Sequence, residues 1–174
     1  GPHIFHTNSD KIWNYVNNFT TFEPYFHRVT AIVEGMNLPV PFNIRSLFMA
    51  FPKIIADKVL AELIAEYGFG SKVSILELMK SSNKHIEALG DYVYNNIFLQ
   101  YTLKQWGLNP RDIDKSITAR IPIYLSHDTR YFQDKFQGMP TNGYSSMIEN
   151  MLDNSLIKVQ LNSEYKDIDN LDSF

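Results

Sequence analysis

One stretch of the chain, IFLQYTLKQWG from residue 97 to residue 107, carries side chains whose types and spacing suit ligand binding. The four of interest are Phe98, Tyr101, Thr102 and Gln105. Their spacing of i, i+3, i+4 and i+7 places them on one face if the stretch is helical. Aromatic rings stack on a flat ligand and hydroxyl or amide groups orient it, so this face suits a nucleobase with its sugar. A core helix whose tyrosine and tryptophan tips reach polar partners gives the same pattern, and the pattern alone leaves both interpretations open.

The helix that carries this face is predicted from Lys84 to about Gln105, as one helix or as two that are interrupted near Gly90. Gly107 is a typical helix end, because glycine readily adopts the left-handed conformation of a C-terminal cap. Further helices are predicted over residues 10–19, 44–51, 52–67, 73–79 and 143–153.

Strands are predicted on both sides of these central helices. Residues 26–33 alternate and are rich in β-branched side chains, and with residues 38–42 and the turn at Gly35 they predict a hairpin. Residues 116–125 are predicted to be partly extended, residues 126–141 to be a loop, and residues 156–161 to be a last strand. The fold class is therefore α+β, with a mainly helical segment over residues 43–115 flanked by strands of an antiparallel sheet from residues 1–42 and 116–174.

The composition excludes several classes of protein. The 174 residues are 44% hydrophobic and 14% aromatic, which is typical of a globular chain, and the net charge of −3 argues against a dedicated nucleic-acid binder. Cysteine is absent, so neither a disulfide nor a thiolate metal site is expected, which suits a cytoplasmic protein. No apolar run approaches the roughly 20 residues that span a bilayer, so we expect no membrane segment.

Three histidines are the candidate metal ligands of the chain. His3 and His6 are three residues apart, and His27 lies further along. Imidazole is the commonest metal ligand, but no carboxylate lies at a recognised metal spacing, and the i, i+3 spacing suits ligation only on a helix. We therefore predict no metal site.

Several short blocks follow one another between residue 1 and about residue 161. They are GPHIFHT at the start, WNYV from Trp13, YTLKQWG from Tyr101, RIP from Arg120, and YF from Tyr131 with KFQGMP from Lys135. In their order and spacing these blocks resemble the bacterial UDP-galactopyranose mutases. The resemblance implies a partial flavoprotein fold, with residues 1–42 beside the flavin, residues 43–115 as the substrate-binding domain, and a mobile loop at the start of residues 116–174.

The resemblance also implies roles for individual residues. It places His3 and His6 in a loop beside FAD, with His6 against the flavin ring as a catalytic residue, and His27 near the sugar. Arg120 would be catalytic on the mobile loop, where its guanidinium binds the pyrophosphate and offsets charge on the departing UDP, and the Tyr131 hydroxyl would donate to the same phosphates.

The uridine of the substrate would be bound by the helical face described above. Phe98 and Tyr101 would lie at the uridine, with Thr102 and Trp106 as hydrogen-bond donors around the nucleotide. The family commonly has two adjacent aromatic residues where this chain has Ile97 and Phe98, so Ile97 offers an aliphatic contact in place of one ring.

The activity that the resemblance implies is the interconversion of UDP-galactopyranose and UDP-galactofuranose through an adduct between the sugar and N5 of reduced FAD. The parent enzyme would be a cytoplasmic homodimer that serves cell-wall polysaccharide biosynthesis. The chain contains no GxGxxG dinucleotide-binding motif. We therefore expect a fragment that lacks the N-terminal FAD-binding motif and the C-terminal part, and that is inactive and free of flavin on its own.

Two alternatives remain from the residues alone. One is a non-catalytic nucleotide-binding or helical interaction module. The other is a flavoprotein of the amine-oxidase-like fold, against which YTLKQWG, RIP and FQGMP together argue.

Overall fold

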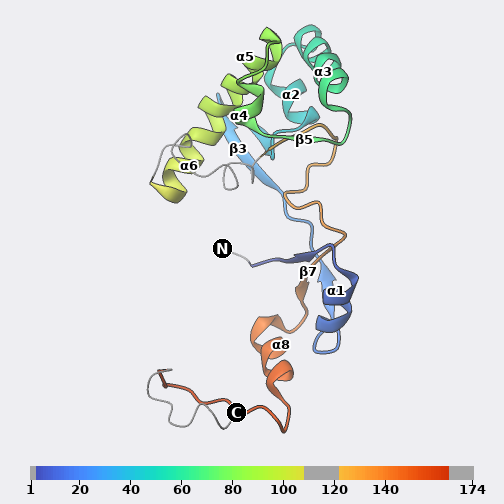
Figure 1. The fold of residues 1–174 in the computed structure, drawn as a ribbon, viewed down its shortest axis with the longest axis vertical. Helices are drawn as coiled ribbons and strands as arrows, with labels where there is room; N and C mark the ends of the chain where they lie inside the picture. The colour runs from blue at the N-terminus through green and yellow to red at the C-terminus, as the bar shows by residue number, and fades with distance from the viewer. Residues whose placement is uncertain (1–2, 108–121, 165–174) are drawn as a thin grey trace. The chain divides into compact units, whose positions relative to one another are not determined.

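The computed structural model describes residues 3–107 and 122–164, which form two compact units (Figure 1). The terminal unit combines Gly1–Tyr25 with Asp134–Phe174, and the central unit is Phe26–Gln133. Both units contain helices and antiparallel strands, so the predicted α+β class is confirmed.

The terminal unit is built on a three-stranded antiparallel sheet. Its elements are β1 (Phe5–Thr7), α1 (Asp10–Val16), β2 (Phe22–Pro24), β7 (Phe136–Pro140) and α8 (Gly143–Leu152). β7 is the central strand, with β1 and β2 on either side. The predicted N-terminal helix begins as expected, because the Ser9 side chain accepts a hydrogen bond from the backbone N–H of Ile12 and so caps the first turn.

Aromatic side chains hold this unit together. Trp13 of α1 stacks on Phe136 of β7 with ring centroids 4.8 Å apart, and Phe5 and Phe22 pack beside them. Gly138 allows the close approach of β2, because a Cβ at this position would lie 2.7 Å from the carbonyl oxygen of Glu23.

The central unit packs a hairpin and several helices around one hydrophobic core. Its elements are β3 (Val29–Val33), β4 (Met36–Val40), α2 (Ile44–Ala50), α3 (Lys53–Tyr67), β5 (Lys72–Val73), α4 (Ile75–Leu78), α5 (Lys84–Val93), η1 (Tyr94–Phe98), α6 (Leu99–Trp106) and β6 (Ile123–Tyr124). The predicted hairpin is confirmed, with Glu34 and Gly35 at its turn in the positive-φ region. Leu38 of the hairpin, Leu63 of α3 and Ile86 of α5 are all buried in this core.

The helix predicted from residue 84 onward forms, but its interruption lies elsewhere. Gly90 lies within α5, where it packs closely against the backbone of α4. The irregularity is instead the π-helical segment η1, between α5 and α6. The hydrogen bonds of a π-helix span one residue more than those of an α-helix. The η1 segment contains no glycine or proline, so nothing in the sequence marks its position.

Two predictions for the C-terminal part are wrong. Residues 136–140 were predicted as loop but form β7. Gly138 has no Cβ and so allows β2 to pack closely against β7, and Pro140 lies at the end of the strand. Residues 156–161 were predicted as a strand but are not extended into a sheet, and the described part of the chain gives them no pairing strand. Leu156 and Leu161 are accordingly exposed.

The close contact at Gly90 generates a stability prediction. In Gly90→Ala the new Cβ would lie 2.7 Å from the backbone nitrogen of Met79, so we expect destabilisation of about 1–3 kcal/mol from overpacking, although alanine is the better helix former. Chemical denaturation of the wild type and the variant measures this difference. Ala88→Gly, at an exposed position of the same helix, is the control and should cost about 1 kcal/mol from propensity alone. A Gly90→Ala variant as stable as the wild type would contradict the packing of α5 on α4.

Candidate functional site

The predicted site residues divide between the two units. His3 and His6 belong to the terminal unit, and the central unit contains the others that the structure describes. Those are His27, Phe98, Tyr101, Thr102 and Tyr131. Arg120 lies outside the described residues, and only the backbone of Trp106, at the end of α6, is described.

Within the central unit, three predicted residues from distant segments converge. The backbone N–H of Tyr131 donates to the carbonyl oxygen of His27 at 2.8 Å. The two rings lie edge to face, with centroids 6.0 Å apart. Tyr101 of α6 lies close enough to the Tyr131 hydroxyl to raise the pKa of Tyr131 through its charge and a side-chain hydrogen bond, and Tyr101 is 40% exposed. Tyr101, Tyr131 and His27 are called the tyrosine–histidine cluster below.

The loop that carries Tyr131 is held by its own charged residues. Asp128 accepts hydrogen bonds from the backbone N–H of Arg130 at 3.0 Å and from its guanidinium at 2.7–3.1 Å. The Arg130 guanidinium hydrogen bonds hold the pKa of Asp128 below its usual range. The guanidinium also lies 5.4 Å from the Phe26 ring centroid, which anchors the loop to the segment before β3.

Burial and the neighbouring phenol determine the protonation of Tyr131. Burial is the largest cause that raises its pKa, and the charge and hydrogen bond of Tyr101 raise the pKa further. Tyr131 therefore keeps its proton at neutral pH. The cluster offers phenol hydroxyls that donate to phosphate or sugar oxygens, together with ring faces on which a base can stack.

Two other residues of the predicted face lie inside the protein. Phe98 is 2% exposed and packs near the Tyr94 ring, and Thr102 is 3% exposed. Ile97 is buried as well. The prediction assumed a uniform α-helix, whereas Phe98 ends the π-helical segment, which changes the direction of the side chains around it. A ligand can contact Phe98 or Thr102 only if they become uncovered.

In the terminal unit, His6 takes part in a small polar network. Its Nδ1 lies 2.8 Å from a carboxylate oxygen of Asp134, and the other oxygen accepts from the Asn8 amide at 2.6 Å. If Nδ1 carries the proton that Asp134 accepts, Nε2 is left with its lone pair. Asp134 and Asn8 were not among the predicted site residues, because their pairing depends on the β1–β7 register across more than a hundred residues. His3 is exposed ahead of β1.

Neither a metal-binding cluster nor a membrane-spanning helix is found among the described residues. The described ranges, residues 3–107 and 122–164, contain no group of three or more histidine or acidic side chains arranged to hold a metal ion. Among the helices in those same ranges, none has the length and apolarity needed to cross a membrane.

Comparison with known proteins gives a consistent class, the sugar-nucleotide mutases. A family model described as UDP-galactopyranose mutase matches residues 96–173. A Klebsiella pneumoniae protein named probable UDP-galactopyranose mutase is 38% identical over 165 residues, which cover 95% of this chain and 42% of that protein. A UDP-galactopyranose mutase of Mycoplasma genitalium is 32% identical over 164 residues, covering 93% and 40%. An Escherichia coli dTDP-fucopyranose mutase is 32% identical over 161 residues, covering 92% and 42%.

The resemblance to the UDP-galactopyranose mutases that the sequence blocks indicated is therefore confirmed over nearly the whole chain. The chain spans about two fifths of the length of these curated relatives, at 40–42% of each.

The hydrogen bond between the two phenols can be tested by titration. Tyr101→Phe removes the hydroxyl that helps to raise the pKa of Tyr131, so that pKa should fall toward its ordinary value of about 10 and stay above it because burial remains. NMR of ¹³C-labelled tyrosine as a function of pH measures the change, and Tyr15→Phe at an exposed position is the control.

The same shift predicts how stability depends on pH. Because the pKa of Tyr131 is higher in the folded chain, its phenol ionises at a lower pH in the unfolded chain. The contribution of Tyr131 to the free energy of unfolding is therefore complete below about pH 10, and it is lost as the pH rises through the pKa of the folded chain. An unchanged Tyr131 titration in Tyr101→Phe would contradict the contact.

Proposed function

We propose that this chain provides the nucleotide-sugar-binding part of a UDP-galactopyranose mutase, which interconverts UDP-galactopyranose and UDP-galactofuranose. The observation that carries the proposal is the tyrosine–histidine cluster. The family resemblance assigns three residues to one substrate, and these residues, separated by up to 104 positions between His27 and Tyr131, lie together in the fold. The names of the relatives support the same reaction class.

In this proposal, the cluster orients the substrate. Tyr101 reaches the surface and would stack on the uracil base, while the protonated hydroxyl of Tyr131 would donate to a phosphate oxygen. His27, against the Tyr131 ring, would face the sugar. Trp106, at the end of α6, would donate to the nucleotide, and Arg120 would close over the pyrophosphate.

The remaining residues of the predicted face have a supporting role in the proposal. Phe98 and Thr102 are buried, so they would line the base of the uridine site after a small movement of α6. Holding the substrate in one orientation lowers the barrier by removing rotational and translational freedom before reaction.

FAD is part of the proposal for the parent enzyme. The exposed ring of His6, anchored by Asp134, suits a side chain that contacts a planar ring system, and His3 would lie in the same segment. When bound, reduced FAD would supply the nucleophile that the anomeric carbon of the sugar requires. The role of His6 is to keep a fixed ring and a defined tautomer beside that cofactor.

The chain supplies only part of such a cofactor site. It has no GxGxxG loop to hold the pyrophosphate of FAD, and the relatives are more than twice as long. We therefore propose that the chain alone is inactive and binds no flavin. For the parent we propose a cytoplasmic homodimer in cell-wall polysaccharide biosynthesis. The alternative is a non-catalytic nucleotide-binding module, which would bind UDP without any turnover by the parent protein.

Base stacking by Tyr101 is the first test. In the full-length protein, Tyr101→Ala should weaken UDP binding by about 1–3 kcal/mol, which is the range for base–aromatic stacking. Calorimetric titration with UDP gives the affinity, and dTDP is a useful second ligand because one relative is named a dTDP-fucopyranose mutase. Tyr15→Ala, at an exposed tyrosine in α1, is the control. Unchanged UDP affinity in Tyr101→Ala would mean that this residue is only part of the helix packing.

Arg120 should affect turnover more than binding. Charge builds on the pyrophosphate as the glycosidic bond breaks, so Arg120→Ala in the full-length protein should lower kcat by a larger factor than it weakens UDP binding. Arg120→Lys keeps the charge but loses the bidentate geometry, so it should recover activity only in part. Turnover with reduced flavin and UDP titration separate the two effects. If turnover of Arg120→Ala stayed near the wild-type value, the assignment of Arg120 to the pyrophosphate would be wrong.

A further inference from the structure

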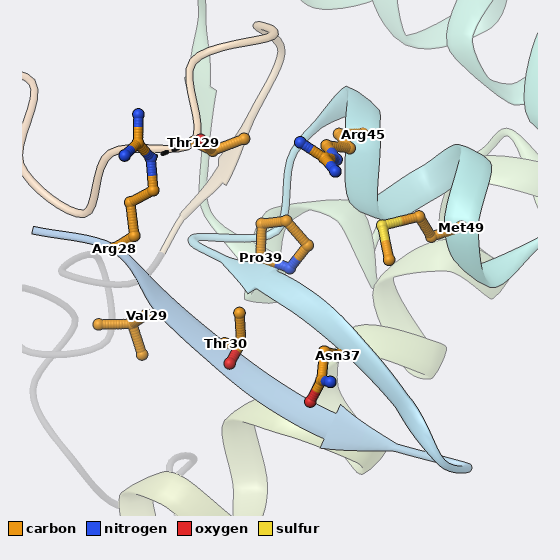
Figure 2. Close-up of a pocket in the computed structure, with 8 residues that line it drawn as sticks. All are labelled: Arg28, Val29, Thr30, Asn37, Pro39, Arg45, Met49 and Thr129. Carbon is orange, nitrogen blue, oxygen red and sulfur yellow. Dashed lines mark hydrogen bonds between the residues drawn. The ribbon is translucent and has the colours of Figure 1, made fainter.

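A groove of about 290 Å³ opens on the central unit, and two arginines line it (Figure 2). Thr30 of β3 and Asn37 of β4 come from the outer face of the hairpin. Arg45 comes from the first turn of α2, and Arg28 and Thr129 come from the segments before β3 and after β6. Figure 2 shows Arg28 and Arg45 on opposite sides of the groove, with Thr129 between them at its rim.

Buried hydrogen bonds fix the walls of this groove. The Asn43 side chain, 2% exposed, accepts from the Ser46 backbone N–H at 3.1 Å and donates to the Asp128 carbonyl oxygen at 3.5 Å. The fully buried Ser46 hydroxyl donates to the carbonyl oxygen of Pro39 at 2.8 Å. These bonds tie α2, β4 and the loop at residue 128 together. Because Arg45 and Thr129 stand on these tied segments, the groove is formed before any ligand arrives.

The two arginines keep their charge available to a ligand. Arg28 Nε donates to Thr129 Oγ1 at 3.3 Å, which orients the guanidinium and occupies one of its five donors. Asp128 of the adjoining loop also attracts Arg28 through its charge, but the hydrogen bonds to both of its carboxylate oxygens come from Arg130. Within residues 3–107 and 122–164, neither Arg28 nor Arg45 forms an ion pair with a carboxylate.

We propose that this groove binds a phosphate group, and that its ligand is a phosphomonoester of small-molecule size. Two guanidinium groups match the charge of a phosphate dianion and donate in pairs to its oxygens. Thr30 and Asn37 add a hydroxyl and an amide for the organic part of the ligand. The volume of about 290 Å³ is at the lower limit for ligand pockets, roughly 300 Å³, so the groove takes a small phosphorylated molecule rather than a nucleotide sugar. The described residues that line the groove include no member of the tyrosine–histidine cluster.

The test is an amide NMR titration of the ¹⁵N-labelled 174-residue chain with inorganic phosphate and with glucose 6-phosphate, at constant ionic strength kept with sodium chloride. The expected result is saturable shifts at the amides of Thr30, Asn37, Arg45 and Thr129, with tighter binding of glucose 6-phosphate. Arg28→Gln and Arg45→Gln should each weaken binding about tenfold, since each removes hydrogen bonds from a charged donor. Both arginine side chains are exposed, so neither substitution should prevent folding. Dispersed spectra of the two variants check that they are folded.

Two control variants make the result specific. Lys58→Gln removes a charge from an exposed position of α3 outside the groove and should leave phosphate affinity unchanged. Arg120→Gln should also leave it unchanged, which separates this groove from the pyrophosphate position proposed for the substrate. Shifts that cluster at Tyr131 and disappear in Arg120→Gln would overturn the proposal and leave the proposed mutase function intact. Shifts equal to those caused by sodium chloride alone would overturn it as well.

Discussion

The central unit depends on one buried amide. Asn43 caps the first turn of α2 through Ser46, and its amide nitrogen reaches the carbonyl oxygens of Pro41 and Asp128. The backbone of Asn43 also forms a parallel β-bridge with the backbone of Tyr124. The side chain is 2% exposed, so each unmade hydrogen bond would carry the full penalty of a buried polar group, about 1–3 kcal/mol. One residue therefore joins the hairpin, the helices and the returning chain near residue 124.

The loop that follows Asp128 takes its position from this junction. The Arg130 guanidinium donates hydrogen bonds to Asp128 and lies over the Phe26 ring. The backbone N–H of the next residue, Tyr131, donates to the carbonyl oxygen of His27. The same loop carries Thr129 into the arginine-lined groove. Thr129 and Tyr131, two residues apart in one short loop, thus belong to different features, since Thr129 lines the groove and Tyr131 is part of the tyrosine–histidine cluster. A rigid loop of this kind orients donors before a ligand binds, which lowers the entropic cost of binding.

Local patterns in the sequence predicted the elements that local physics controls. Alternation over β3 and β4 with Gly35 between them predicted the hairpin, and the apolar spacing ended by Gly68 predicted α3. Longer-range features were beyond such patterns. The π-helical segment before α6 has no glycine or proline to mark it, and β7 contains Gly138 and Pro140, which usually indicate a loop.

The same division applies to the candidate site. The residue types of Tyr101, Tyr131 and His27 were recognised from family motifs, but no spacing rule places residues 30 to 104 positions apart in contact; only the tertiary fold does so. The sequence did not predict Asp134 as a site residue, because its contact with His6 depends on the pairing of β1 with β7, which are far apart in the sequence. The sequence assigned no role to Arg28 or Arg45, because only the packing of the hairpin and α2 brings them to one groove.

The central claim is that Tyr101 and Tyr131 act as one ligand-binding face. A double-mutant cycle on UDP affinity in the full-length protein, with Tyr101→Phe, Tyr131→Phe and the double variant, tests it most directly. Residues that are in contact and share a ligand couple by about 0.5–3 kcal/mol, so the double variant should differ from the sum of the single variants by an amount in that range. Additive losses, or no loss from either variant, would contradict the account.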